Sequence, residues 1–200
     1  RYIHSINGDF SKIQGLKING PIGGKGIALI RMLGGRDFDW NQRVATARMS
    51  YLDLYNADIR KDENPIYYTL KGKNQYVYDN EAVTQWMLWN RDKLETVILP
   101  KSVKSIDYAA LYDMLYLKKV VVGDNTTYIG NDAFGECPEL KTLVFLCNDK
   151  PELHRDAFTD PVEGARYQVD NFYVPKSLVD KYTADYQYTD HAKNINVKYD

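Results

Sequence analysis

The side chains best suited to chemistry are three histidines and two cysteines, and their spacing argues against a catalytic or metal site. The histidines lie far apart along the chain, at His4, His154 and His191. None has a second ligand at the spacing that a metal site uses, and neither a C-x-x-C nor an H-E-x-x-H pattern occurs. Serine, cysteine and histidine form no pattern typical of a nucleophile elbow or a catalytic triad. We therefore expect ordinary loop histidines, with no catalytic residue, metal or cofactor.

The cysteines and a glycine-rich segment also have simple interpretations. Cys137 and Cys147 are the two cysteines of the chain, and they either form one disulfide or stay reduced. For Cys137, which follows the second apolar block of a repeat, we favour a small buried apolar side chain. Residues 23–26 read GGKG, which lacks both the dinucleotide-binding and the phosphate-loop patterns. We interpret this segment as a terminal loop and expect that the chain is not an enzyme.

Composition excludes two classes of partner. Lysine and arginine number 26 and aspartate and glutamate 27, which gives a net charge of −1. A balanced charge supplies no basic surface for nucleic acid, and no apolar run is long enough to span a bilayer. Tyrosine is abundant, with 17 residues against 6 phenylalanines. Its polar hydroxyl on an apolar ring suits surfaces that are partly exposed to solvent. We therefore expect no nucleic-acid partner and no membrane span.

A self-repeat of 23 residues organises the middle of the chain. Its three copies begin at Leu94, Leu117 and Leu140 and open LETVIL, LKKVVV and LKTLVF. Each copy has large apolar residues at positions 0, +3 and +5, and a second apolar block follows, such as Ile106 with residues 110–111. A unit of this length cannot bury its apolar face alone, so the copies must stack on one another.

The opening pattern extends in both directions along the chain. It fits Ile13/Leu16/Ile18, Met49/Leu52/Leu54 and Val169/Phe172/Val174. Between Met49 and Leu94 a further repeat keeps its second half, at Val83 with residues 87–88, while a polar, tyrosine-rich stretch at 60–80 replaces its first half. We therefore expect about seven stacked turns.

Each repeat opening predicts a short strand that pairs in parallel with its neighbours. Positions +3 and +5 should point inward and position +4 outward, because side chains alternate along a strand. The second block predicts a short extended piece on a second wall. The stretch after it, at 107–115 or 131–136, predicts a short helix or a 3₁₀ turn.

The outward +4 positions form a first candidate interaction surface. Its members are Lys17, Asp53, Ile98, Val121, Val144 and Tyr173. Three consecutive aliphatic residues would make an exposed apolar stripe, and such patches often mark interfaces. The alternative, which we favour, is that strand propensity alone selects these residues or that a neighbouring loop covers them.

The tyrosine-rich insertion is the second candidate surface. Its aromatic residues are Tyr67, Tyr68, Tyr76 and Tyr78, with Trp86 and Trp89 just beyond. Aromatic rings can stack on sugars, and tyrosine-rich loops bind proteins well. The favoured alternative is that these rings pack the insertion onto the stack, with at least one tryptophan in the core.

The two ends of the chain depart from the repeat, as terminal units of a stack should. Residues 25–33 predict a helix with an apolar face that ends at Gly34–Gly35. Ser177 predicts the N-cap of a short helix that buries Leu178 and Tyr182. Residues 194–199 alternate and predict a strand that closes the sheet edge. We expect one domain over 1–200, with an N-terminal cap at 1–48, repeats at 49–160 including the insertion at 60–80, and a C-terminal cap at 161–200.

The repeats resemble the BspA-like leucine-rich-repeat family, whose unit reads roughly L-x-x-I-x-L-P-x-S-V-x-x-I-G-x-x-A-F-x-x-C-x-x-L. The matching strings are LETVILPKSVKSIDYAAL at 94–111 and YIGNDAFGECPEL at 128–140. Residues 172–188 and 16–38 resemble the terminal and opening units of secreted members from gut anaerobes. The chain departs from the pattern at 60–80 and at Asp107, where the family usually has glycine. The resemblance implies a right-handed leucine-rich-repeat solenoid, α/β to mainly β, with a parallel strand face and atypical helical caps.

The resemblance also implies a function. Members of the family are exported and surface-associated, a few are credited with adhesion to host proteins, and none has catalytic residues to transfer. Because the chain starts at Arg1, an export signal would lie upstream. We expect a non-enzymatic binding module of an exported bacterial surface protein that engages a host or matrix protein. The alternatives are a carbohydrate-binding module that uses exposed tyrosine and tryptophan, and a structural spacer.

Overall fold

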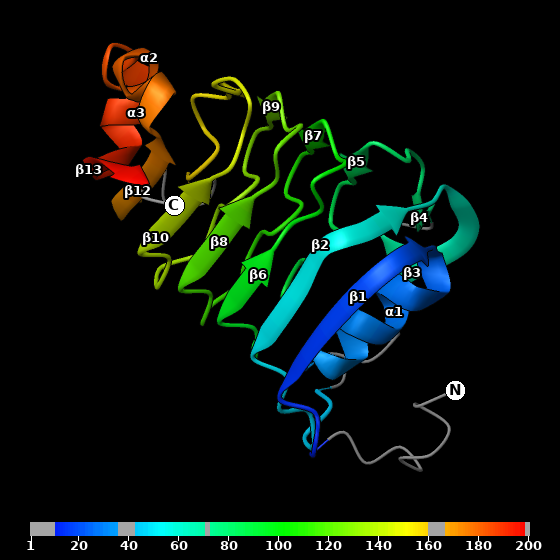
Figure 1. The fold of residues 1–200 in the computed structure, drawn as a ribbon. Helices are drawn as coiled ribbons and strands as arrows, with labels where there is room; N and C mark the ends of the chain where they lie inside the picture. The colour runs from blue at the N-terminus through cyan, green and yellow to red at the C-terminus, as the bar shows by residue number, and fades with distance from the viewer. Residues whose placement is uncertain (1–10, 36–42, 71–72, 160–166, 199–200) are drawn as a thin grey trace.

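Parallel strands form the largest layer of the molecule, which was analysed as a computed structural model (Figure 1). The structure describes residues 11–35, 43–70, 73–159 and 167–198, and the side chains of 65–70 and 73–74 lie outside the described part. A seven-stranded sheet has the order β1-β2-β6-β8-β10-β12-β13, with every pair parallel. Its strands are β1 (Gly15–Ile22), β2 (Tyr51–Ile59), β6 (Thr96–Ile98), β8 (Lys119–Val122), β10 (Thr142–Phe145), β12 (Val169–Pro175) and β13 (Ala192–Lys198).

The second wall is a sheet of four two-residue strands, as the sequence predicts. Its order is β11-β9-β7-β5, all parallel, with β5 (Ala82–Val83), β7 (Ser105–Ile106), β9 (Tyr128–Ile129) and β11 (Glu152–Leu153). The inward positions of the repeats are buried between the walls: Leu117, Val120 and Val122 are 0% exposed. The predicted inward set 0, +3 and +5 is therefore confirmed in the regular repeats. At the N-terminal edge Ile13, Leu16 and Ile18 are only partly buried, because β1 has a strand on one side alone.

The turn that carries the insertion differs from the prediction. We expected residues 60–80 to replace the first half of a separate repeat, but β2 pairs directly with β6 while β5 pairs with β7. Since β6 and β7 are the two halves of one turn, β2 and β5 are the two halves of the turn before it. The insertion lies between them as an antiparallel hairpin of β3 (Asp62–Leu70) and β4 (Lys73–Val77). The seventh strand of the large sheet is instead β13, at the C-terminal edge.

After the second block we expected a short helix or a 3₁₀ turn, and the structure shows turns there, with bonds such as that from the Gly135 N–H to the Asp132 carbonyl at 2.9 Å. Residues 107–115 and 131–136 form turns. Two residues with positive φ recur every 23 residues in these turns, in one series at Trp86, Ala109 and Asp132 (φ 61°, 50° and 51°) and in the other at Asn90, Asp113 and Glu136 (φ 56°, 55° and 50°). A left-handed residue breaks a right-handed helix. It also turns N–H groups sideways, so that the amides of Ala109, Leu111 and Asp113 donate to carbonyls of the next repeat at 2.9–3.1 Å.

The helix α1 (Gly24–Leu33) matches the predicted N-terminal helix, and it packs against the insertion. A Cβ on Gly24 would lie 2.2 Å from the carbonyl oxygen of Asn64, so only glycine allows this approach. The Gly24 N–H donates to the Asp62 carboxylate at 2.9 Å, which gives the helix N-terminus a negative partner. At the other end of α1, the buried Arg31 donates from Nη1 to carbonyl oxygens of Trp86 and Met87, both at 3.0 Å. The glycine-rich segment at 23–26, which we expected to be a loop, instead begins α1, and its glycine allows the close approach of the insertion.

The C-terminal segment contains a 3₁₀ turn (Lys176–Leu178), α2 (Val179–Thr183), α3 (Tyr186–His191) and then β13. Leu178 and Tyr182 are buried as predicted. Ser177 is not an N-cap, because it lies inside the 3₁₀ turn and makes no cap hydrogen bond. Asp185 caps α3 by accepting from the Gln187 N–H at 3.0 Å.

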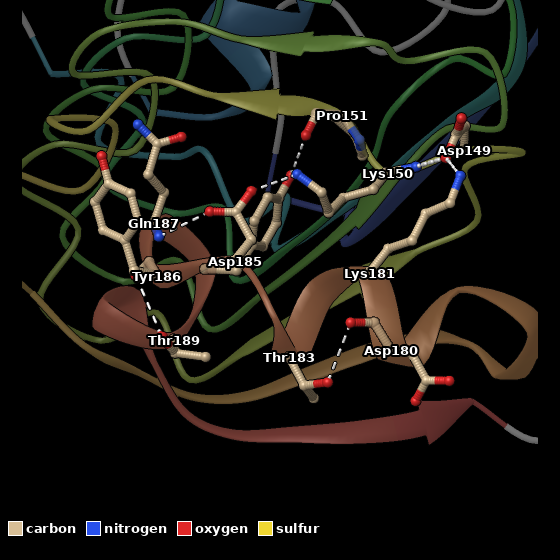
Figure 2. A network of polar contacts seen from close by, with 11 residues as sticks. Asp149, Lys150, Pro151, Asp180, Lys181, Thr183, Asp185, Tyr186, Gln187 and Thr189 are labelled. Atoms are coloured by element: carbon tan, nitrogen blue, oxygen red, sulfur yellow. Dashed lines mark hydrogen bonds and ion pairs between the residues drawn. The ribbon is translucent and has the colours of Figure 1, made fainter.

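Polar contacts attach α2 and α3 to the segment that follows β10 (Figure 2). The Lys150 ammonium contacts the Asp185 carboxylate and lies 4.9 Å from the ring centroid of Tyr188. The Tyr188 hydroxyl donates to the Pro151 carbonyl at 2.9 Å, and Lys181 donates to Asp149 at 2.6 Å. These contacts fix the C-terminal helices against the last repeat.

Candidate functional site

The outward +4 residues lie in one row across six neighbouring strands of the large sheet. The strand registers pair Lys17 with Asp53, Asp53 with Ile98, Ile98 with Val121, Val121 with Val144, and Val144 with Tyr173. The sequence therefore predicts correctly that these side chains are neighbours. A row of this kind can contact a partner at several turns at once.

The members of this row differ in exposure. Ile98, Val144 and Tyr173 are half-buried, whereas Val121 is 9% and Asp53 5% exposed. The expectation of a stripe of three exposed aliphatic residues is therefore wrong, because Ile98 and Val144 are half-buried and Val121 between them is buried. Asp53 pairs with Lys17, with 3.0 Å between Nζ and Oδ2, and also accepts from the Tyr55 N–H at 2.9 Å. The hydrogen bond from Lys17 to this carboxylate raises the pKa of Lys17.

The C-terminal end of the row borders a hollow in the outer face of the sheet. This hollow has a volume of about 510 Å³ and is lined by Lys119, Thr142, Val144, Tyr173, Val197 and Lys198. Two valines and a tyrosine form its apolar part, and two lysines stand beside them. Sequence reasoning missed Lys119 and Thr142, although both occupy the outward +2 position of their repeats. The same alternation rule that gave the +4 row identifies them.

The tyrosines of the insertion are only partly described. Tyr67 and Tyr68 belong to β3, but their side chains lie outside the described residues. Tyr76 is half-buried and Tyr78 is 44% exposed, and both line an open pocket of about 410 Å³. The Tyr78 hydroxyl donates to the Asp107 carboxylate and accepts from the Gln85 N–H at 3.2 Å. Partial burial, and then the bond to Asp107, raise the pKa of Tyr78, and these contacts attach the hairpin to the repeats.

An aromatic cluster beside the insertion combines predicted and unpredicted residues. The Trp86 ring lies edge-on to Trp89, Tyr108 and Tyr112, with centroids 5.5, 5.2 and 5.8 Å apart. Both tryptophans are partly exposed, and Tyr108 is 43% exposed. Sequence analysis omitted Tyr108 and Tyr112, although Trp89 and Tyr112 are equivalent positions one repeat apart. The cluster presents ring edges together with the exposed Tyr108.

The thiols and histidines show no arrangement for catalysis among the described residues. His191 ends α3, is 1% exposed and places Nε2 2.9 Å from the Arg155 carbonyl oxygen, so the expectation of a loop histidine is wrong for this residue. Cys137 and Cys147 are free and buried. Burial raises the pKa of each thiol to about 12, which removes the nucleophilic thiolate at neutral pH. The described part of the chain contains no group of three or more His, Cys, Asp or Glu side chains that could hold a metal ion. His4 lies outside the described residues.

Helices of the described part give no membrane span. None is long and apolar enough to cross a bilayer.

Comparisons with known proteins bear on the repeats. No curated protein matches the chain. One similar solved structure is the crystal structure of the pneumococcal vaccine antigen PcpA, at 16% identity and a TM-score of 0.37; the match covers 79% of this chain and 52% of that one. The chain thus spans about half the length of that protein. Six copies of the model described as "BspA type Leucine rich repeat region" match residues 79–162, and this part of the chain therefore belongs to the BspA-type leucine-rich-repeat family.

Proposed function

We propose that the chain is a non-enzymatic binding module of an exported surface protein, and that it binds a protein partner through the outer face of the seven-stranded sheet. The observation that carries the proposal is the row of Ile98, Val121, Val144 and Tyr173, which ends at a hollow in that face. The BspA-type repeats support a surface location. A capped solenoid agrees with α1 near one end of the stack and α2 and α3 near the other (Figure 1).

The hollow suggests the chemistry of the partner. Val144 and Tyr173 offer apolar surface for one side chain, and Lys119 and Lys198 stand beside them. We therefore propose a protein segment that carries an apolar side chain next to acidic residues. Apolar contact would supply most of the affinity, and the lysines would mainly set orientation and the rate of association.

The test is binding of the purified chain to immobilised collagen, laminin, fibronectin and fibrinogen, read by surface plasmon resonance. Val144→Asp places a charge in the hollow, and Tyr173→Ala removes its ring. Both should weaken a saturable interaction by at least about tenfold, the effect of losing about 1.4 kcal/mol. Val121→Asp is a poor probe, because a carboxylate at a 9% exposed position would test folding instead.

Tyr186→Ala is the matched control for Tyr173→Ala, since Tyr186 is 70% exposed and lies on α3. Equal weakening by both tyrosine variants, or undiminished binding by both hollow variants, would contradict the proposal. If the chain binds none of the immobilised proteins but still unfolds cooperatively on heating, the result would favour the structural-spacer hypothesis.

Glycan binding through the aromatic cluster is the second candidate. The exposed ring of Tyr108 beside Trp86 favours it, because exposed aromatic surface can pack on a sugar. A neutral glycan array with Tyr108→Ala tests this candidate, and loss of glycan signals with intact protein binding would assign the cluster its own role.

A further inference from the structure

A further pocket lies at the carboxyl ends of the parallel strands, and it contains no residue of the +4 row or of the aromatic cluster. It is open, with a volume of about 1000 Å³. Its walls come from β2, from the segments after β8, β10 and β12, and from the end of β13. Residues distant in sequence therefore meet at one edge of the sheet.

Asp124 gives this pocket an acceptor that lacks a partner. The Tyr55 hydroxyl donates to Asp124 Oδ1 at 3.2 Å. The second oxygen, Oδ2, is buried and accepts no hydrogen bond from any described residue. A buried carboxylate oxygen without a donor is costly, so the geometry favours a ligand or solvent group that donates to Oδ2.

Lysines line the same pocket as this acceptor. Lys176 and Lys198 line the pocket, and the Lys101 ammonium lies 5.4 Å from the ring centroid of Tyr55. The described lining thus contains two lysines and one aspartate, which suits a ligand that carries an anionic group as well as hydrogen-bond donors.

The backbone around the pocket is held in place before any ligand arrives. The Leu146 N–H donates to the Val122 carbonyl at 3.0 Å, and the Asn148 N–H donates to the Asp124 carbonyl at 2.9 Å. The pairing of Pro175 with Lys198 fixes the opposite wall. Such pre-organisation lowers the entropy cost of binding.

We propose that this pocket binds an acidic sugar residue of an anionic glycan, with its carboxylate at Lys176 and Lys198 and a hydroxyl donating to Asp124 Oδ2. A uronic acid offers a carboxylate and several hydroxyls on one rigid ring, which matches the charge and the acceptor together. Asn148 and Ser177 add polar groups at the rim. The site shares Lys198 with the hollow of the protein-binding face proposed above, and its other lining residues are different.

Isothermal titration with a tetramer of galacturonic acid tests the proposal, and its fully methyl-esterified form is the neutral control. The acidic tetramer should bind, the ester should bind at least about tenfold more weakly, and added salt should weaken the acidic tetramer alone. Lys176→Gln and Asp124→Asn should each weaken binding by at least about fivefold. Lys141→Gln, an exposed lysine at the opposite end of β10, should leave it unchanged.

Each remaining outcome overturns the proposal. Acetate that binds as tightly as the tetramer, with the same response to Lys176→Gln, would make this an anion site only. A peptide with a free C-terminal carboxylate that binds more tightly than the tetramer would assign the pocket to proteins. If the folded parent chain, shown by its cooperative thermal melt, does not bind the acidic tetramer, the proposed site is refuted. Tyr173→Ala, which adds no charge beside the shared Lys198, should keep tetramer binding, so failure of this proposal can be distinguished from failure of the protein-binding face.

Discussion

Phe134→Ala tests whether the repeats stack in the assigned register. The Phe134 ring is 1% exposed and stacks on Phe158 of the next turn, with centroids 5.2 Å apart and planes 20° apart. Truncating a buried phenylalanine costs about 3–5 kcal/mol, and a ring pair of this kind adds about 0.5–1.5 kcal/mol beyond its buried area. We therefore expect a loss of about 4 kcal/mol in the free energy of unfolding.

Urea denaturation followed by far-ultraviolet circular dichroism measures this loss. For a chain of this size each kcal/mol lowers Tm by about 2–4 °C, so the melting temperature should fall by about 8–16 °C. Tyr186→Ala, which removes a ring that is 70% exposed, should change the unfolding free energy by no more than about 0.5 kcal/mol. A loss below about 1 kcal/mol for Phe134→Ala would refute the register, because a ring between two turns cannot be removed at so little cost.

Four further predictions concern buried groups. Gly123→Ala should destabilise the chain by about 1–3 kcal/mol, because the new Cβ would lie 2.2 Å from the Pro100 carbonyl oxygen; an unchanged urea midpoint would contradict the packing of these two turns. Cys137 and Cys147 should resist a thiol reagent at pH 8 until the chain is unfolded in guanidinium, and rapid labelling of the native chain would show that a thiol is exposed. Burial raises the pKa of both folded thiols to about 12. The stability that the buried neutral thiols contribute is therefore present at neutral pH and is lost as the pH rises from about 8.5 towards 12. An unfolding free energy that stays constant over this alkaline range would contradict the prediction. Arg31→Met should cost about 3 kcal/mol, because the Trp86 and Met87 carbonyls lose a charged donor, and a thermal melt within about 2 °C of the parent would refute that role.

The strands of the repeats could be predicted because their signal is local. Alternation within TLVF places Leu143 and Phe145 inward, both 0% exposed, and Val144 outward. The 23-residue period then aligns the same positions of neighbouring turns. This reasoning gave the parallel sheet, the second wall and the neighbours along the +4 row.

Features that depend on contacts between distant segments could not be predicted from local sequence patterns. The hairpin was misplaced because the insertion is close to one period long, so its length mimics a missing repeat; only the pairing of β2 with β6 shows otherwise. The turn at Trp86 has φ 61°, which no local propensity favours and which hydrogen bonds to the next turn help to hold. The pocket beside Asp124 needs Tyr55 from β2, a residue that lies 69 positions away along the chain.

Binding of the chain and its Val144→Asp variant to the panel of matrix proteins tests the central claim most directly. We predict that the parent binds at least one immobilised protein with saturation, that Val144→Asp weakens this binding by at least about tenfold, and that Tyr186→Ala leaves it unchanged. Saturable binding that survives Val144→Asp, with both proteins melting at the same temperature, would contradict the claim that the outer face of the sheet is the binding surface.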